Sequence, residues 1–346
     1  MKELYLIVGY NDFFGQTRKP WVSIDTSRLV SELENLGYIV HKNEFHEIVN
    51  GKVKIENQIV FYTFSHRLNL QQYIRDCLLY LLDCGNTLIP SYELFCCHEN
   101  KGWQVLLRRK LGIEGLWNAY FSSKRELKDY EIKYPVVLKT ITGSNAKGVF
   151  LVKDEEDLLK KIKSLEKQPS IAQKLDFVRR KYFRKYKKIP GYPDYDLFKD
   201  AQLYQDYITP EIPFVLQEFI PNLTYDYRVI ALGEKYFVSK RLTRKNDFRA
   251  SGAKRFTFDF PVPVKLLDFA RELHHKIHSP YLSIDVGENE EGDLYLFEFQ
   301  VEHFGINAIV LGKGYYVEKE GKWEFVEEKT PFEKDLAYGL DLFLSS

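Results

Sequence analysis

The hydrophobic positions of residues 1–95 alternate between strand-like and helical spacing. Short apolar runs typical of strands occur in LYLIVGY, QIVFYTF and NTLIPS, and YIVHKNEF is extended. Leu29, Leu33 and Leu36 recur at helical spacing, and a longer helix is predicted in LQQYIRDCLLYLLDCG. This alternation predicts a small open α/β sheet with helices against it. Because GYNDFFGQ after the first strand lacks the GxGxxG spacing, we expect no dinucleotide site there.

The second predicted unit, residues 96–212, begins with a helix and continues with a glycine-containing loop between two strands. The helix lies in NKGWQVLLRRKLGI and has Lys101 at its start. In YPVVLKTITGSNAKGVFLV, Lys139 ends the first strand, and the loop holds Gly143, Ser144 and Gly148. Glycine tolerates dihedral angles that let backbone N–H groups approach an anion, so the loop is a candidate phosphate site. The alternative is a plain glycine hairpin, and the GKS or GKT ending of a Walker loop is missing.

Residues 168–212 are predicted to be a basic helical insertion in this unit. Its apolar residues step by three and four, as on one face of a helix, at Leu175, Val178, Tyr182, Tyr186 and Ile189. Between Lys174 and Lys188 there are eight Lys or Arg residues against one acid, Asp176. Two interpretations remain open: a solvated helix face, or a docking surface for an anionic partner such as a phosphorylated carrier, a membrane surface or nucleic acid.

The third predicted unit, residues 213–346, contains the strand FVLQEFI and two hairpins. The first hairpin, YRVIALGEKYFVSKRL, turns at Gly233–Glu234. On its second strand, Phe237, Ser239 and Arg241 share one face. The second hairpin pairs Ser283–Gly287 with Leu294–Gln300. Basic residues gather beside this carboxylate-bearing hairpin at Arg228, Lys240, Arg241, Arg244, Lys245 and Arg249.

Two carboxylates inside the strands of the second hairpin are the strongest chemical signal. Apolar strands usually keep carboxylates in the turn, but Asp285 and Glu298 lie within strands. Strand alternation places Glu298 and Gln300 on one face. Basic residues next to acidic strands favour an anion and a metal ion between them. The alternative is an ordinary polar hairpin.

Composition restricts the function classes. The chain has 346 residues, 50 Lys or Arg against 49 Asp or Glu, and 45% hydrophobic residues, which favours an ordinary globular protein over one that coats a polyanion. No apolar run reaches the ~18 residues of a membrane span, and MKELYLIVGY is interpreted as a strand, not a signal peptide. None of Cys77, Cys84, Cys96 and Cys97 forms a CxxC pair, which indicates reduced thiols in a cytoplasm.

The ordered set of motifs resembles the ATP-grasp superfamily, which includes D-alanine–D-alanine ligase and glutathione synthase. The motifs are Lys101, VVLK with GSNAKG, LQEFI, DYR, KRLTRKNDFR, SIDV and FEFQ, and the resemblance covers residues 90–312. It implies an α/β and α+β fold in which two ATP-grasp subdomains, 96–212 and 213–346, follow a small open α/β (pre-ATP-grasp) domain at 1–95. The C-terminal subdomain would carry the metal site.

The resemblance also implies a nucleotide site. Lys101 and Lys139 would contact the α- and β-phosphates of ATP, and the loop from Gly143 through Ser144 to Gly148 would close over the triphosphate. The connector that binds adenine would comprise Gln217, Glu218, Phe219 and Ile220.

Further residues would serve the reacting groups. Asp226 and Arg228 match a recurring Asp-x-Arg motif, and Arg228 would contact a phosphate or the acyl group. Arg241 and Arg249 would stabilise the transferred phosphoryl group. The catalytic residues that the resemblance implies are thus Arg228, Arg241 and Arg249.

The metal ligands implied are Asp285, Glu298 and Gln300, which would hold two Mg²⁺ ions, with Mn²⁺ as the alternative. Gln300 stands where the family usually has Asn; its amide oxygen can still ligate, although its longer side chain must bend. His303 is either a residue that reaches an acceptor substrate or a loop histidine without that role.

The activity implied is amide or peptide bond formation between a carboxylate and an amine through an acyl phosphate. The substrates would be small molecules, with a peptide or a sugar acid of a surface polysaccharide among the options. The alternatives are a phosphotransferase of the same fold and an inactive nucleotide-binding module. No stable nucleic-acid binding is expected, and a homodimer remains open.

Overall fold

The computed structural model describes residues 2–15, 23–65, 67–143, 148–166, 168–183, 190–191, 193, 195–244, 247–253, 255–301 and 303–346. The chain divides into two units. Unit 1 comprises Met1–Leu116, Thr142–Lys147 and Ile220–Ser346, and unit 2 comprises Trp117–Ile141 and Gly148–Phe219. The three-domain division predicted from the sequence stays a prediction.

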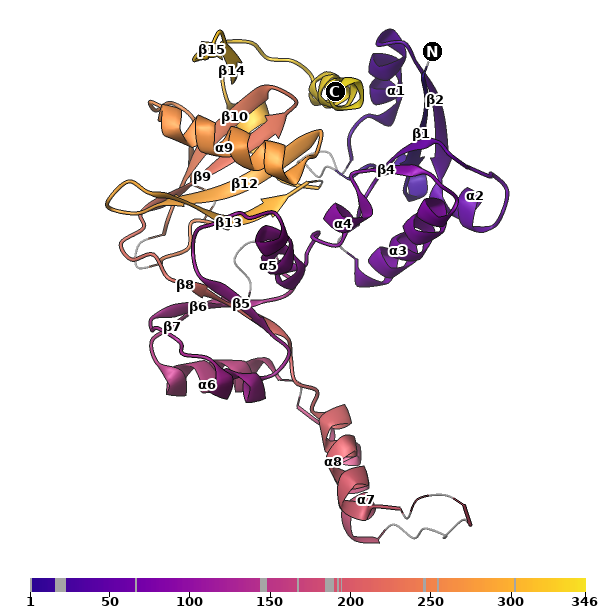
Figure 1. Ribbon diagram of the computed structural model, residues 1–346, viewed down its shortest axis with the longest axis vertical. Coiled ribbons are helices and arrows are strands. Elements are labelled where there is room, and N and C mark those ends of the chain that lie inside the picture. The colour runs from indigo at the N-terminus through magenta and orange to yellow at the C-terminus, as the bar shows by residue number, and fades with distance from the viewer. Residues whose placement is uncertain are drawn as a thin grey trace. The chain divides into compact units, whose positions relative to one another are not determined.

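The N-terminal part of unit 1 is a parallel sheet in the order β2-β1-β3-β4 (Figure 1). Its strands are β1 (Lys2–Val8), β2 (Tyr38–Glu44), β3 (Ile59–Tyr62) and β4 (Thr87–Ile89). Its helical segments are η1 (Tyr10–Asp12), α1 (Thr26–Asn35), α2 (Phe45–Val49), α3 (Leu68–Asp83) and α4 (Tyr92–Phe95). The elements confirm the predicted alternation of strands and helices.

Strand β1 is almost continuously apolar because both of its faces are covered. Leu4 and Leu6 pack in one cluster with Leu29 and Leu33 of α1. Ile7 lies on the other face, in the cluster that includes residues of α2 and α3. The sheet is therefore buried on both sides, and its strand ends are the part that a ligand can reach.

The C-terminal part of unit 1 is a second sheet, in the order β13-β12-β9-β10-β14-β15, with β11 paired to β10. Its strands are β9 (Tyr225–Leu232), β10 (Lys235–Leu242), β11 (Phe256–Thr257), β12 (Tyr281–Glu288), β13 (Leu294–Gln300), β14 (Tyr315–Lys319) and β15 (Lys322–Val326). The helices here are α9 (Val264–Ile277), α10 (Asn307–Leu311) and α11 (Phe332–Ser345). Both hairpins predicted from the sequence, β9–β10 and β12–β13, are confirmed.

Alternation along β9 separates an apolar face from a face that is polar at one end. Val229 and Ala231 join the cluster that contains the buried residues of α9. On the other face, Ile230 joins the cluster that contains residues of α11, whereas Asp226 and Arg228 lie at the beginning of the strand. The polar end of this face thus holds two of the predicted site residues.

Unit 2 is built on an antiparallel sheet in the order β5-β8-β6-β7. Its strands are β5 (Asn118–Phe121), β6 (Val136–Thr140), β7 (Val149–Val152) and β8 (Phe214–Glu218). Its helical segments are η2 (Lys124–Asp129), α6 (Glu155–Leu165), α7 (Ile171–Phe183) and α8 (Leu197–Ile208). Leu158 and Ile162 of α6 pack with Val136 and Leu138 of β6 in its core.

The predicted insertion contains a pair of helices. Helix α7 ends at Phe183, and α8 contacts it. Tyr186 and Ile189, the last two residues of the predicted stripe, lie outside the described residues. The first three positions of the stripe (Leu175, Val178 and Tyr182) are exposed to solvent, so the periodicity marks a helix but not a buried face.

Within the described residues, no helix combines the length and the apolar composition that a membrane crossing requires.

Candidate functional site

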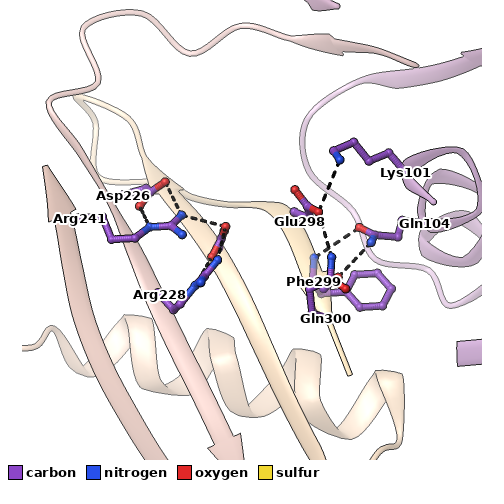
Figure 2. Close-up of polar contacts among 9 residues, drawn as sticks. Lys101, Gln104, Asp226, Arg228, Arg241, Glu298, Phe299 and Gln300 are labelled. Carbon is purple, nitrogen blue, oxygen red and sulfur yellow. Dashed lines mark hydrogen bonds and ion pairs between the residues drawn. The ribbon is translucent and has the colours of Figure 1, made fainter. Parts of the chain in front are cut away.

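Helix α5 (Lys101–Lys110) is fixed to the edge strand β13 by one glutamine. Gln104 donates its side-chain amide to the carbonyl oxygen of Phe299 at 3.0 Å and accepts from the Phe299 backbone N–H at 3.4 Å. It also donates to the carbonyl of Cys97 at 3.1 Å. These bonds occupy edge positions that a further strand would otherwise use. Gln104 therefore sets the position of α5 along β13, as Figure 2 shows.

Lys101, at the start of α5, points toward the residues at the end of β13 (Figure 2). The residue is only 7% exposed. Its Nζ donates to the carbonyl oxygen of Gly143 at 2.8 Å and lies 3.8 Å from Oε1 of Glu298. The backbone N–H of Gly143 in turn donates to Glu99 at 3.1 Å. The structure thus brings together Lys101, the first residue of the glycine loop and a predicted metal ligand.

Gln300 carries a buried oxygen with unused bonding capacity. Its amide nitrogen donates to Oε1 of Glu298 at 3.0 Å. Its Oε1 is buried and accepts no hydrogen bond from the residues that the structure describes. A buried polar atom left in this state costs about 1–3 kcal/mol, so a missing ligand is its simplest explanation.

These donors fit Mg²⁺ coordination. No three His, Cys, Asp or Glu side chains of the described residues form a group able to hold a metal. Mg²⁺, however, is usually bound by one or two carboxylates together with substrate phosphates and water. The half-buried carboxylate of Glu298 and the open amide oxygen of Gln300 suit that type of site.

Asp285 lies directly opposite Glu298 in the β12–β13 pair, but its carboxylate is already engaged. Arg228 donates to its two oxygens, from Nε at 2.8 Å and from Nη2 at 3.0 Å. Nη2 of Arg241 lies 2.8 Å from Oδ2 of Asp285. Arg241 also binds both oxygens of Asp226, at 2.6 and 2.7 Å. We call Asp226, Arg228, Arg241 and Asp285 the paired network.

Asp285 and Arg241 keep their charges although they are buried, whereas burial raises the pKa of Asp226. Burial by itself would raise the pKa of Asp285, but the charges of Arg228 and Arg241 outweigh it and lower that pKa to about 2. Burial would lower the pKa of Arg241, and the carboxylates of Asp285 and Asp226 instead hold it above its ordinary value. Arg241 was expected to face a phosphoryl group; its described contacts are with these two carboxylates.

Three further predicted residues belong to unit 1. Arg249 binds Asp247, with Nε 2.9 Å from Oδ1. Ile220 is buried at the start of the segment that follows unit 2. Ser144 lies outside the described residues.

Unit 2 carries the other part of the predicted nucleotide site. Lys139 lies on β6 and pairs in register with Val149 of β7. Gly148 follows the loop and has φ +74°, and a Cβ there would meet the side chain of Thr140. A side chain at this position would therefore be strained as well as crowded.

The predicted connector residues extend along and beyond β8. Gln217 is buried, whereas Glu218 is exposed. The Glu218 carboxylate accepts the backbone N–H of Trp117 at 3.1 Å. Phe219 is the last residue of unit 2. Binding of adenine by this segment remains a prediction.

Sequence reasoning missed Gln104 and the pairing of Asp226 with Arg241. A polar residue three positions after Lys101, next to the apolar Val105 on the helix, was a usable signal for Gln104. The alternation of β9 and β10 could also have suggested the pair, because Asp226 and Arg241 are register partners in the hairpin.

Comparisons with known proteins were made by sequence and by structure. No family model matches the chain, and no curated protein matches its sequence. Among solved structures, D-cycloserine synthetase superposes with a TM-score of 0.54 at 10% identity, covering 98% of each chain. L-amino acid ligase from Bacillus licheniformis gives 0.52 at 13% identity, covering 99% of this chain and 75% of the other.

A macrocyclase from Microcystis aeruginosa, solved with its precursor peptide, gives a TM-score of 0.50 at 11% identity and covers 97% of each chain. At such identities the likeness concerns the fold alone. The superpositions agree with the mixed α/β sheets described above. The chain has the ATP-grasp fold.

Proposed function

We propose that this protein is an ATP- and Mg²⁺-dependent ligase that joins a carboxylate to an amine as an amide, releasing ADP and phosphate. One observation carries the proposal: Lys101, Glu298 and Gln300 converge, and the buried Oε1 of Gln300 has no partner among the described residues. A cation and two oxygen ligands at one point suit a phosphate chain with its metal ion.

The proposed nucleotide contacts follow the sequence motifs. Lys101 and Lys139 would bind phosphates, and the loop from Gly143 to Gly148 would cover them. Gln217, Glu218, Phe219 and Ile220 would bind adenine. Glu298 and Gln300 would hold the metal ion, and Asp285, the third predicted ligand, would join them only by giving up a contact with Arg228 or Arg241. Bound there, Mg²⁺ or Mn²⁺ would neutralise charge on the phosphates.

The chemistry would proceed in two steps. The substrate carboxylate attacks the γ-phosphorus of ATP, a new O–P bond forms, and the bond to ADP breaks. The amine then attacks the acyl carbon, phosphate leaves, and the amine loses a proton. Phosphoryl transfer needs mainly positioning and charge neutralisation.

The three arginines would have different roles in these steps. Arg228, whose guanidinium is partly exposed, would contact the acyl or phosphoryl group, and Arg249 would approach after leaving Asp247. Arg241 would act as a positioning residue, because Asp226 and Asp285 enclose it. Location in the cytoplasm stays a prediction from the cysteine pattern.

A two-part experiment tests the proposal. Saturating Mg·ATP should raise the melting temperature, because a ligand at 100 times its Kd stabilises by about 2.7 kcal/mol. An ADP-release screen of carboxylate and amine pairs should then yield an amide. A stable phosphorylated product would instead establish the phosphotransferase, and an ATP shift without any turnover across the screen would favour the inactive module. If Mg·ATP neither raises the melting temperature nor is hydrolysed in the screen, the proposal is wrong.

A further inference from the structure

A cavity of about 450 Å³ opens at the carboxyl ends of β1, β2 and β3. Its lining includes residues that follow each strand directly, such as Gly9, Phe45 and Thr63. In the order β2-β1-β3-β4, β2 is added on one side of β1 and β3 on the other, so the order of the parallel strands reverses between β1 and β3. Open parallel sheets bind ligands beyond the carboxyl ends of their strands at such a reversal. The volume is typical of a site for a small molecule.

The lining is mainly aromatic and aliphatic, with Phe13, Phe45, Phe64, Tyr73 and Ile74 among its residues. The hydroxyl groups of its serine and threonine residues already have partners. Ser23 accepts from the backbone of Phe14, Thr63 accepts from Gly15, and Ser65 accepts from Arg67. An apolar group would be well accommodated among the aromatic and aliphatic side chains.

One cation in the lining is available for a ligand. Arg67 is exposed, and its guanidinium has no ion pair or hydrogen bond with the described residues. The acid of the lining, Glu44, is occupied by Nδ1 of His46 at 2.9 Å and by the N-terminus of α2. Arg67 therefore suits a carboxylate, which a guanidinium binds through two parallel hydrogen bonds.

The wall of the cavity formed by His303 adjoins the candidate active site. His303 is buried and adopts a left-handed conformation with φ 55°, which is uncommon for a residue other than glycine and often marks a functional site. It follows Gln300 by three residues, so their Cα atoms are at most about 11 Å apart. Gly305, two residues further, lies against Nη1 of Arg228.

We propose that this cavity binds the amine substrate of the ligase, and that this substrate is an α-amino acid with a large apolar side chain. The proposal rests on the proposed function. Arg67 holds the carboxylate of the amino acid, and Phe45, Phe64 and Ile74 surround its side chain. The reacting end faces His303, because that wall adjoins β13. With the carboxylate held by Arg67, the group left to react is the amine.

The test is a binding experiment on the full chain, with and without Mg²⁺ and adenylyl imidodiphosphate. The probes are L- and D-phenylalanine, L- and D-alanine, phenethylamine, which lacks the carboxylate, and 3-phenylpropanoate, which lacks the amine. We expect one enantiomer of phenylalanine to bind at least about tenfold more tightly than alanine and phenethylamine, because these lack the apolar side chain and the carboxylate respectively.

Two substitutions locate the binding. Arg67→Gln should weaken phenylalanine binding by at least about tenfold, whereas Arg75→Gln, an exposed arginine on the same helix, should not. Leu70→Trp should fill the cavity and abolish binding, whereas Leu79→Trp, exposed on α3, should not. Mg·ATP should stabilise all four variants as it does the wild type.

The outcomes separate this inference from the proposed function. If ATP stabilises the protein but neither enantiomer of phenylalanine binds, with or without the nucleotide analogue, the cavity assignment is wrong and the ligase proposal survives. Unchanged binding in Arg67→Gln, or equal binding of phenethylamine, also overturns it. If phenylalanine binds in a way that depends on Arg67 but Mg·ATP does not change the melting temperature, the cavity is an amino-acid site and the ligase proposal is wrong.

Discussion

Two groups of charges occupy neighbouring positions on one face of the C-terminal sheet, and they differ in how completely they are paired. In the paired network, two carboxylates and two guanidiniums neutralise one another at distances of 2.6–3.0 Å. In the group at β13, Lys101 lies 3.8 Å from Glu298, and the Oε1 of Gln300 accepts no hydrogen bond from described residues.

The difference indicates a structural role for the paired network and a ligand-binding role for the group at β13. Buried charges are tolerated where each has a partner, and removing one partner of such a pair is costly. The paired network can therefore position strands β9, β10 and β12 without any ligand. In the β13 group, the Oε1 of Gln300 can still accept a bond, as expected of residues that bind a substrate or its metal ion. Substitutions in the two groups should have different consequences.

The largest effect is expected for Glu298→Gln. A neutral amide cannot balance a divalent ion, so turnover should fall by at least about a thousandfold, equal to about 4 kcal/mol in the activation barrier. The melting temperature should change little, because Glu298 is half-buried and only loosely paired. Turnover and thermal denaturation are measured on the same preparation. Glu291→Gln, exposed in the turn of the same hairpin, is the control. Wild-type turnover in Glu298→Gln would show that the carboxylate is structural.

Arg241→Met should lower the stability of the folded protein. Without the guanidinium, Asp226 and Asp285 remain buried with one arginine between them, and the free energy of unfolding should fall by about 3–5 kcal/mol. Urea denaturation measures this loss. Lys240→Met on the same strand removes only contacts over aromatic rings and should cost about 1 kcal/mol. If both variants lose equal stability, the paired network has no special structural role.

Asp285→Asn should lower both turnover and stability, because Asp285 belongs to the paired network and lies opposite Glu298. We expect turnover to fall as in Glu298→Gln and the free energy of unfolding to fall by about 1–3 kcal/mol, since the buried Arg241 and the partly buried Arg228 lose a charged acceptor. Turnover and urea denaturation are compared with those of Glu298→Gln. Stability equal to that of the wild type would mean that Asp226 alone satisfies the arginines.

Gln104→Leu tests whether the position of α5 matters for the β13 group. The backbone groups of Phe299 and the carbonyl of Cys97 would lose their partner, at a cost of about 1–3 kcal/mol in the free energy of unfolding. The Kd for Mg·ATP should rise by about tenfold, because Lys101 is no longer held. Calorimetric titration measures this change. An unchanged Kd would indicate that Lys101 is positioned by Gly143 instead.

The smallest effect is expected for Gln300→Asn. The amide oxygen is retained and the side chain loses one methylene, so turnover should stay within about tenfold of the wild type. Gln300→Leu, which removes the oxygen at similar volume, is the matched comparison and should lose much more activity. Equal activity in both variants would mean that the buried Oε1 has no ligand.

Much of the fold was contained in local sequence patterns. The alternation of apolar runs and helical spacing in residues 1–95 predicted the parallel sheet with its helices, and the hairpins β9–β10 and β12–β13 followed from strand periodicity and glycine turns. Such features depend on neighbours within a few residues, so a single sequence determines them. The same reasoning placed Glu298 and Gln300 on one face of a strand.

Local periodicity predicted helix α7 correctly but left open what covers its apolar residues. The predicted stripe on α7 is real as a helical pattern, but Leu175, Val178 and Tyr182 are exposed. Its charges are also partly neutralised, because Arg179 and Arg180 bind Asp176 and Arg180 lies over the ring of Tyr204. A repeat of apolar residues specifies a face, whereas only the surroundings specify what covers it. Docking of an anionic partner there stays a prediction.

Only the tertiary structure decided which polar groups have partners. Gln104 meets Phe299 across 195 positions of sequence, and Arg228 meets Asp285 across 57. The sequence by itself determined which residues could bear charge at the ends of β9, β12 and β13. It could not determine that Asp285 is neutralised while the oxygen of Gln300 is left open, because pairing depends on strand order and register. Those are set by burial of the apolar faces of the whole sheet, not by the polar residues themselves.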